Sequence, residues 1–317
     1  MGQSRWSDDV YAAAGASRAL TGASAMAYHD DVVSRMSPEE RRTHPQMNPH
    51  GVTRESRDSV EHPTSLAIGV LLDVTGSMAR VPRIVQAQLC QLFGLLLRGV
   101  NDQPLVPHPQ ILIGAVGDAY CDHGPLQIGQ FESGNEVDLD LGKLWLEGGG
   151  GGQNHESYEL AMYFMARHTA IDCWERRQHK GYLFICGDEL AYPAVARQQI
   201  QSVIGDTVDS SIPTPQIVTE LRRRYNVYFV RMGGTTHYNE PWLIEGWNNL
   251  LGAEYVLTLP NPNAISATIA TTVCLQESMV DYDALLAAIP EDQRGHVAVA
   301  TDIVRRMPRR VVVGDPA

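Results

Sequence analysis

The stretch 66–78, LAIGVLLDVTGSM, constrains the fold of this 317-residue chain more than any other part of it. Its first half is a short apolar run that ends in a polar turn, and the run is too short to cross a membrane. Such a run is typical of a strand buried inside a parallel sheet. Apolar residues then recur at helical spacing over 81–96, with Pro82 in the first turn. The sequence therefore predicts a buried strand, a polar turn and a helix.

The alternation of strand and helix continues along the chain. Further strands are expected at residues 111–117, 126–131, 181–186, 227–230 and 255–257, and the second and third of these six strands should pair across a short turn. Further helices are expected to open within 153–157 and to cover 217–225 and 242–251. We therefore predict an α/β fold with a doubly wound, Rossmann-like, mainly parallel sheet of six strands flanked by helices.

The length of the chain favours one large domain with appended segments. We expect residues 1–63 to form an N-terminal helical and extended arm that packs on the main domain. Residues 64–275 should form that domain, and residues 276–317 a C-terminal helical extension.

Three segments of the predicted fold carry oxygen-bearing side chains at the same edge of the sheet. Ligands of open α/β sheets bind beyond the carboxyl ends of the strands, where these segments should meet. Hard divalent cations such as Mg²⁺ take oxygen ligands and keep several waters, so the segments predict a metal site. The side chains are Asp73, Thr75 and Ser77 after the first strand, Gln153 and Asn154 after the glycine run 148–152, and Asp188 after strand 181–186.

Two further acidic residues have more than one interpretation. Asp118 follows the second strand, where it could reach the metal through a water or another ligand, or could only stabilise its own turn. Glu156 falls in the first turn of an expected helix, where a carboxylate is favourable against the helix dipole without any metal. We therefore expect a structural role for Glu156.

In these residues the chain resembles the von Willebrand factor A domain family. The metal-ion-dependent adhesion site of that family combines an Asp-x-Ser/Thr-x-Ser turn, a threonine in a second loop and an aspartate after the fourth strand. Asp73, Thr75 and Ser77 match the turn, and Asp188 takes the place of the last aspartate. The resemblance covers roughly residues 64–275 and is closest to the intracellular, bacterial-type branch with an Asp-x-Thr-Gly-Ser-Met turn. No threonine follows the glycines of the second loop. Gln153 or Asn154 must therefore replace that threonine as a metal ligand, or a water occupies the ligand position.

The resemblance implies a non-enzymatic, metal-dependent protein-binding module. A divalent cation, Mg²⁺ or alternatively Mn²⁺ or Ca²⁺, would be held by the residues of the turn and by Asp188, and completed by a Glu or Asp of a partner protein. Intracellular members of the family often act with AAA+ ATPases or within multi-protein systems. We therefore expect a partner of that kind.

Two other functions stay open at this point. A metal-assisted phosphohydrolase could use Asp73 as nucleophile, because Asp-x-x-Gly-Ser is similar to the haloacid dehalogenase motif. That motif carries a second Asp at the position of Thr75 and needs a downstream Lys, whereas Lys180 precedes a strand and should lie at the opposite edge. Phosphate-loop, nucleophile-elbow and HExxH motifs are also missing from the sequence. The third alternative is a structural subunit whose metal site is vestigial.

Charge and cysteine usage exclude several classes of function. A formal net charge of −12 argues against a nucleic-acid-binding surface, which needs clustered Lys and Arg. The five cysteines are widely spaced and include no CxxC pair, which is typical of free thiols in a reducing compartment. The first residues show no signal-peptide pattern, and the chain has no membrane-spanning run. We expect a cytoplasmic protein without a membrane partner.

Overall fold

The computed structural model describes residues 4–76, 78, 80–100, 103–149, 154–278 and 280–308. Its centre is a six-stranded sheet in the order β12–β11–β7–β2–β3–β4. The strands pair in parallel, except that β4 runs antiparallel to β3. The predicted α/β fold with a mainly parallel, six-stranded sheet is therefore confirmed. The strands are β2 Leu66–Asp73, β3 Pro109–Val116, β4 Leu126–Ile128, β7 Gly181–Gly187, β11 Tyr225–Met232 and β12 Val256–Leu259.

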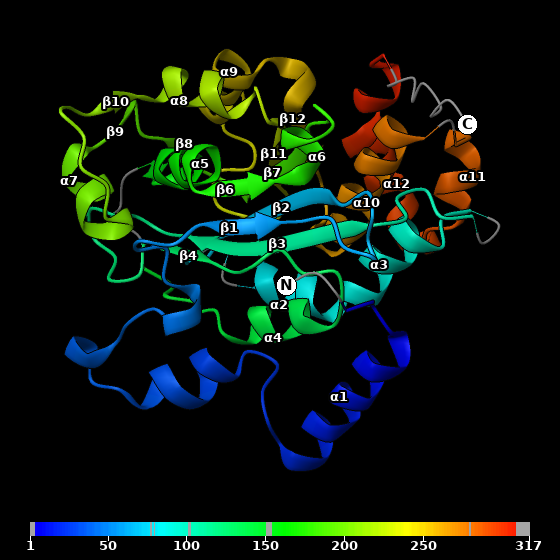
Figure 1. The fold of residues 1–317 in the computed structure, drawn as a ribbon, viewed down its shortest axis with the longest axis horizontal. Helices are drawn as coiled ribbons and strands as arrows, with labels where there is room; N and C mark the ends of the chain where they lie inside the picture. The colour runs from blue at the N-terminus through cyan, green and yellow to red at the C-terminus, as the bar shows by residue number, and fades with distance from the viewer. Residues whose placement is uncertain are drawn as a thin grey trace.

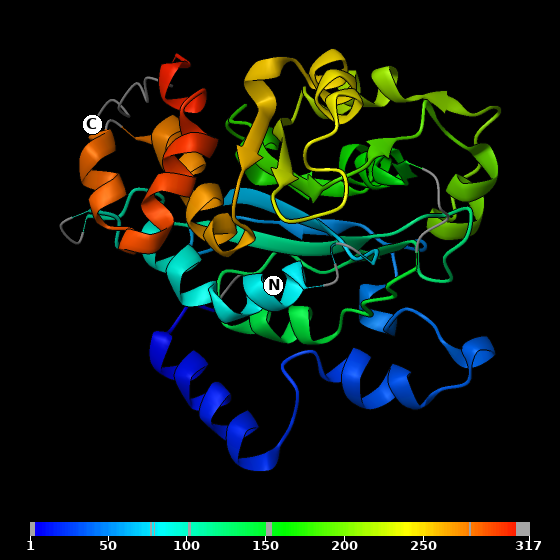
Figure 2. The ribbon, with the colours of Figure 1, turned by 180° about the vertical axis from the view of Figure 1, so that it is seen from behind.

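Helices surround this sheet, and the N-terminal segment with α1 lies to one side of it while α10 to α12 gather at one end (Figures 1 and 2). The described helices are α1 Asp8–Thr21, α2 Val81–Ala87, α3 Leu89–Leu97, α4 Glu136–Gly142, α5 Tyr158–Arg167, α6 Asp172–Glu175, α7 Arg197–Gln199, α8 Thr214–Leu221, α9 Pro241–Leu251, α10 Ile265–Glu277, α11 Tyr282–Ala287 and α12 Glu291–Thr301. Short ladders join β1 Arg54–Ser56 to β6 Thr169–Ile171, β5 His155–Glu156 to β8 Leu190–Ala191, and β9 Ala194–Val195 to β10 Ile212–Pro213.

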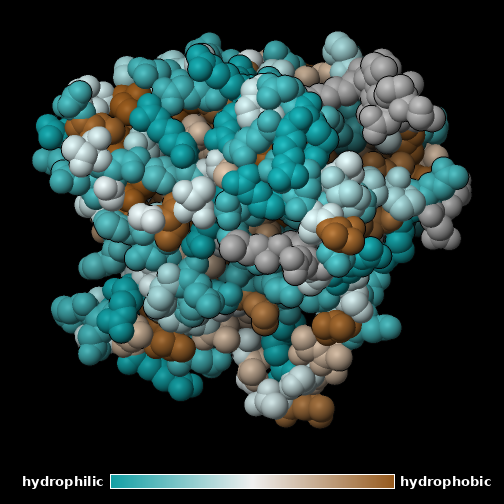
Figure 3. Space-filling model, in the orientation of Figure 1, coloured by the Kyte–Doolittle hydropathy of each residue, from teal (hydrophilic) through white to brown (hydrophobic). Residues whose placement is uncertain are grey.

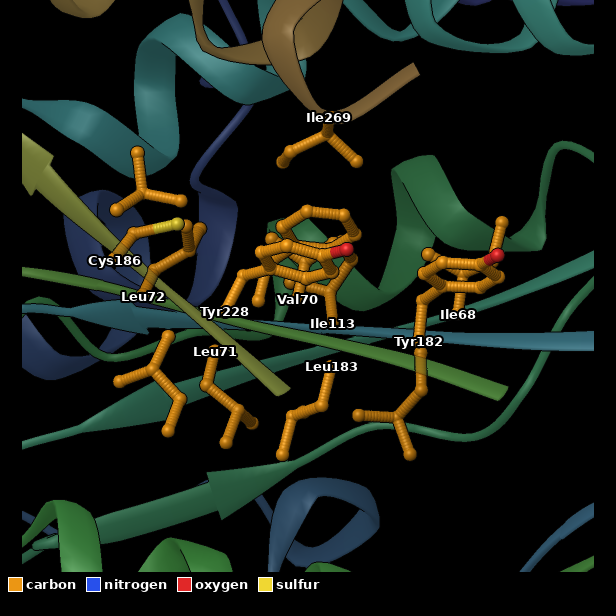
Figure 4. Close-up of a cluster of buried hydrophobic side chains, with 14 of the residues drawn as sticks. Ile68, Val70, Leu71, Leu72, Ile113, Tyr182, Leu183, Cys186, Tyr228 and Ile269 are labelled. Carbon is orange, nitrogen blue, oxygen red and sulfur yellow. The ribbon is translucent and has the colours of Figure 1, made fainter. Parts of the chain in front are cut away.

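Strand β2 lies in the middle of the core, and all eight of its residues are buried. Figure 4 shows Ile269 of α10 over one face of the sheet, on the side to which Val70 points, while Leu71 points to the opposite side. On that opposite side α5 approaches closely, because a Cβ built at Gly69 would lie 3.0 Å from the Met165 side chain. Helices therefore cover both faces of β2, which explains its uninterrupted apolar run.

Two helical regions differ from the expectation. The helix predicted after the turn is divided into α2 and α3 at Gln88, whose backbone (φ −112°, ψ 14°) leaves the helical region. The Gln88 side-chain amide donates to the carbonyl of Asn263 at 2.6 Å, which ties this break to another element. Helix α10 was not predicted, because it is buried on all sides and therefore lacks an amphipathic period.

The segment after the glycine run also differs from the expectation. The predicted helix begins only at Tyr158, and His155 and Glu156 instead form β5, which pairs in parallel with β8. Contacts with distant segments favour the extended backbone here: Leu190 N–H donates to the carbonyl of Asn154 at 3.1 Å. Glu156 therefore lies in a strand, and the first helical turn predicted for it is wrong.

The face shown in Figure 3 is mainly hydrophilic, with small hydrophobic patches scattered over it, some of them at the bottom of the view. None of the residues of α1 is buried, and Leu20 near its end is 88% exposed. In the tail, Asp281 caps α11 by accepting from the N–H of Ala284, and Val297 of α12 is buried. No helix among the described residues is long and apolar enough to cross a membrane.

Candidate metal site

The turn after β2 is folded around the side chain of Asp73. This carboxylate is fully buried, and its Oδ1 accepts from the backbone N–H of Thr75 at 2.8 Å and from the Thr75 hydroxyl at 2.5 Å. The same turn is tied to the glycine-rich loop, because Gly76 N–H donates to the carbonyl of Gly149 at 3.1 Å. The first two residues of the predicted motif therefore lie together, while Ser77 lies outside the described residues.

Tyr158, the first residue of α5, holds the other oxygen of Asp73. Its hydroxyl donates to Asp73 Oδ2 at 2.5 Å, and its ring is fully buried against Trp247 of α9. Gly187 allows this approach, because a Cβ at that position would clash with the Tyr158 hydroxyl. The sequence gives Tyr158 only as part of an apolar helix face, so its contact with Asp73 was not predicted.

Asp188 follows β7, the strand that pairs with β2, and its side chain is fully buried. Its Oδ2 accepts from the backbone N–H of His237 at 3.4 Å. Burial raises the pKa of Asp73, and the negative charge of Asp188 raises it further, against the hydrogen bonds from Thr75 and Tyr158 that lower it. The structure thus places the two predicted aspartates within electrostatic reach of each other at neighbouring strand ends.

Glu189 extends this acidic region. Burial raises its pKa to about 8, and the charges of Asp73 and Asp188 add to that effect. Its backbone carbonyl accepts from Trp247 Nε1 at 2.8 Å, which fixes the turn after β7 to helix α9. The buried Oε2 of Glu189 has no hydrogen-bond partner among the described residues.

Asp118 is fully buried in the turn after β3. Its Oδ1 accepts from the N–H of Tyr120 at 3.0 Å, and the hydroxyl of Tyr192 lies 3.1 Å from its Oδ2. These contacts give Asp118 the turn-stabilising role that was one of its two interpretations. Its charge nonetheless reaches the other carboxylates, since it contributes to the raised pKa of Glu189.

The glycine-rich loop contributes differently from what the sequence predicted. Gln153 lies outside the described residues, and the side chain of Asn154 is exposed. Glu156, two residues further on, is 1% exposed, and its Oε2 has no hydrogen-bond partner among the described residues. Burial raises the pKa of Glu156 strongly, and the charge of Asp73 is the largest of the electrostatic contributions. We call Asp73, Asp118, Glu156, Asp188 and Glu189 the acidic cluster.

The chemistry of the acidic cluster fits a hard cation. Among the described residues, no ion pair reaches Asp73 or Glu156, and Glu189 meets the imidazole of His237 at 3.8 Å. Buried carboxylates without partners are costly unless a proton or a cation neutralises them. Within the described part of the chain, His, Cys, Asp and Glu side chains form no group of three placed to hold a metal. Hydroxyl oxygens such as that of Thr75 must therefore complete any ligand set.

An aromatic rim borders the acidic cluster. Tyr120 is 57% exposed and packs on Tyr192 with ring centroids 4.5 Å apart, and His155 stacks on Tyr192 at 5.2 Å. Beside the rim lies a hollow of about 320 Å³. Its lining includes Arg41, Cys121, Asp122, His123, Trp145, Glu147 and Gly149. This part of the surface therefore combines aromatic rings, carboxylates and one exposed arginine.

Replacing Tyr158 by Phe is expected to weaken the binding of Mg²⁺ about tenfold in a calorimetric titration, because it removes the hydroxyl that orients Asp73. Tyr163→Phe is the matched control, since it removes from the same helix a hydroxyl that donates to Asp206 at 2.6 Å, outside the acidic cluster. The control should keep the affinity of the unchanged protein. An equal loss in both variants would contradict the role of Tyr158.

No protein-family model and no curated protein sequence matches this chain. Similar solved structures include the pilus adhesin SpaC from Lactobacillus rhamnosus GG in its open conformation, at 9% identity and a TM-score of 0.47, covering 72% of this chain and 31% of that one. They also include proximal thread matrix protein 1 from the mussel byssus, at 12% identity and a TM-score of 0.41. That match covers 67% of this chain and 46% of the mussel protein. A structure of the same mussel protein with a zinc-occupied MIDAS motif has 10% identity and a TM-score of 0.36. It covers 69% of this chain and 47% of the mussel protein. This chain thus spans between about a third and about a half of these proteins. Structural similarities with such low TM-scores do not indicate a function for this chain.

Proposed function

We propose that this protein is a non-enzymatic, metal-dependent protein-binding module whose site is the turn after β2. The observation that carries the proposal is the geometry of Asp73, which is fully buried at the carboxyl end of a central strand with both oxygens oriented. Asp188, at the end of the adjacent strand, places a second carboxylate within electrostatic reach. This arrangement supports the resemblance on which the sequence-based hypothesis rested.

Asp73, Thr75 and Asp188 would hold the cation, together with Ser77, which lies outside the described residues. Thr75 and Tyr158 keep Asp73 in one orientation, so little side-chain entropy remains to be lost on binding. We propose Mg²⁺ as the cation, with Mn²⁺ and Ca²⁺ as alternatives, because the donor atoms are oxygens. When bound, a divalent cation supplies positive charge that attracts a carboxylate of the partner protein.

We propose that the partner contacts the aromatic rim and presents an acidic side chain to the site. Tyr120 offers an exposed ring next to the acidic cluster, and tyrosine is a residue type enriched in protein interfaces. The resemblance suggests an AAA+ ATPase or another component of a multi-protein system as the partner. All five cysteines are free, which supports the cytoplasmic location proposed for this system.

No observation favours the phosphohydrolase alternative. A nucleophilic Asp73 would need a second carboxylate two residues further on to act as acid and base, and this chain has Thr75 there. Lys143 pairs with Asp140 at 2.7 Å, and Lys180 directly precedes the first residue of β7, at the end of that strand opposite to Asp188. The two lysines of the chain therefore do not supply the cation that such a reaction requires.

The test is a capture experiment with the purified chain as bait. Proteins from a lysate should be retained in Mg²⁺, released by chelator, and absent when the bait carries Asp73→Asn. Stoichiometric binding should then be reproduced with the purified partner in Mg²⁺ alone. Retention of the same proteins by both baits, with or without chelator, would overturn the proposal.

A further inference from the structure

A hollow of about 570 Å³, formed by helices α5, α6 and α8 and the turn after α8, is separate from the candidate metal site. The residues that line it are Ala166, Trp174, Gln216, Thr219, Glu220, Arg223 and Arg224. Arg224 directly precedes β11, and its carbonyl accepts from the N–H of Gly181, the first residue of β7, at 2.9 Å. The hollow therefore lies at the amino ends of these strands, whereas Asp188 follows the carboxyl end of β7.

The two carboxylates in and beside this hollow already have cationic partners. Glu220 forms a bidentate ion pair with Arg167, with distances of 2.9 and 3.0 Å, and the hydrogen bonds from that guanidinium lower the pKa of Glu220. Glu175 lies 3.2 Å from the guanidinium of Arg224 and 2.7 Å from that of Arg57. Both carboxylates are therefore neutralised within the chain.

Arg223 is a cation that this arrangement leaves without a counterion. Its side chain is exposed at the hollow, and among the described residues its guanidinium forms no ion pair. Trp174 of α6 is partly buried against the core, and the described part of the chain offers no hydrogen-bond partner to its indole N–H. A guanidinium and an indole N–H only donate hydrogen bonds, so together they favour a ligand with negatively charged oxygens.

The charge and the residue types of the hollow indicate which anion fits. Arg223 brings one unbalanced positive charge, which matches a single carboxylate, and the planar guanidinium can bind a carboxylate through two parallel hydrogen bonds. The net charge of −12 disfavours a long polyanion such as nucleic acid. Tryptophan and arginine are the residue types that contribute most to binding energy in protein interfaces. An acidic protein segment is therefore the ligand that fits best.

We propose that this hollow binds an acidic segment of a partner protein, with an Asp or Glu side chain paired to Arg223 and a neighbouring apolar side chain placed on Trp174. The hollow and the candidate cation lie at opposite ends of the strands of the sheet. The proposal is therefore independent of the proposed function, and it adds a second contact surface to the molecule.

The experiment follows the fluorescence anisotropy of a fluorescein-labelled peptide, Asp-Glu-Phe-Asp-Glu, titrated with the full chain at low ionic strength in chelator. The peptide should bind saturably, and its uncharged counterpart Asn-Gln-Phe-Asn-Gln should not. Arg223→Ala is expected to weaken binding about tenfold, because it removes a hydrogen-bonded pair of charged groups. Arg223→Lys should give an intermediate affinity, since it keeps the charge but loses the planar fork.

Arg176→Ala is the matched control. Arg176 is also exposed, at 64%, but it pairs with Asp172 at 3.3 Å and does not line the hollow. The control should bind the peptide within about twofold of the unchanged chain. Circular dichroism should show the same fold in both alanine variants, because both side chains are exposed.

Three results would overturn the proposal. The unchanged chain could fail to bind the peptide, or the two alanine variants could lose affinity equally, which would indicate only a general attraction of charges. Inorganic phosphate could displace the peptide at matched ionic strength, which would indicate an anion site without a protein partner. Because the titration is made in chelator, each of these results leaves the metal-dependent function untouched, and a chain that binds no Mg²⁺ could still bind the peptide.

Discussion

Asp73→Asn is expected to lose cation binding by at least about 100-fold and, in chelator, to be no less stable than the unchanged protein. Asparagine keeps the shape of the side chain and an oxygen for the two donors of Thr75, but it brings no negative charge. Because burial and Asp188 raise the pKa of Asp73, the ionised form costs stability in the folded state. That cost grows as the pH rises from the ordinary pKa of an aspartate to the raised pKa of Asp73, about 6, and is constant above it. A neutral isostere removes it.

Two measurements check this prediction: calorimetric titration with Mg²⁺, and thermal unfolding in chelator near neutral pH. Asp206→Asn is a suitable control, since Asp206 accepts from Tyr163 and His168 outside the acidic cluster and has a lowered pKa. That control should lose stability while keeping its cation affinity. Unchanged Mg²⁺ affinity in Asp73→Asn would place any metal elsewhere in the molecule.

Trp247→Ala is expected to cost about 3–5 kcal/mol of the free energy of unfolding, the range for truncating a fully buried large aromatic side chain. The indole stacks on Phe229 with ring centroids 3.9 Å apart and meets Tyr158 edge-on at 5.6 Å. It also donates to the carbonyl of Glu189, so its loss should loosen the turn that carries Asp188. Cation affinity should therefore fall together with stability. Urea denaturation followed by circular dichroism measures the first effect, and calorimetry the second.

Two further variants should lose less stability than Trp247→Ala and so test which contacts of Trp247 matter. Trp247→Phe keeps an aromatic ring but loses the donor to Glu189 and part of the buried volume, so we expect a smaller loss than for Trp247→Ala, about 1–3 kcal/mol. Trp242→Ala truncates a partly exposed tryptophan of the same helix and should cost less than Trp247→Ala. If Trp247→Ala were as stable as Trp242→Ala, the packing of α9 on the sheet would have to differ from that described.

The sequence predicted the parts of the site that local pattern determines. The apolar run of β2 indicates a buried strand, and the polar turn that follows places Asp73 and Thr75 at its carboxyl end. Asp188 could be placed because it ends a second apolar run, and parallel strands bring their carboxyl ends to one edge. Alternation of strands and helices was sufficient for the fold class.

The contacts that complete the site depend on tertiary structure and could not be predicted in this way. Tyr158 has the spacing of a core residue, and only the packing of α5 on the sheet brings its hydroxyl to Asp73. Strand β5 has two residues, too few to show any period, and its pairing with β8 is what turns Glu156 inward. The helical expectation for that segment failed because hydrogen bonds to Leu190 and Ala119 outweigh the local preference.

The edge of the sheet at β4 limits how copies of the protein can associate. This antiparallel strand has three residues, and the carbonyl of Ile128 accepts from the guanidinium of Arg54 at 2.7 Å. The side chain of its Gln127 exchanges two hydrogen bonds of 2.8 Å with the backbone of Trp145. Edge strands that are short and already occupied resist the addition of a further strand. The fold therefore protects this edge of its sheet against edge-to-edge aggregation, and concentrated solutions should not grow fibres through β4.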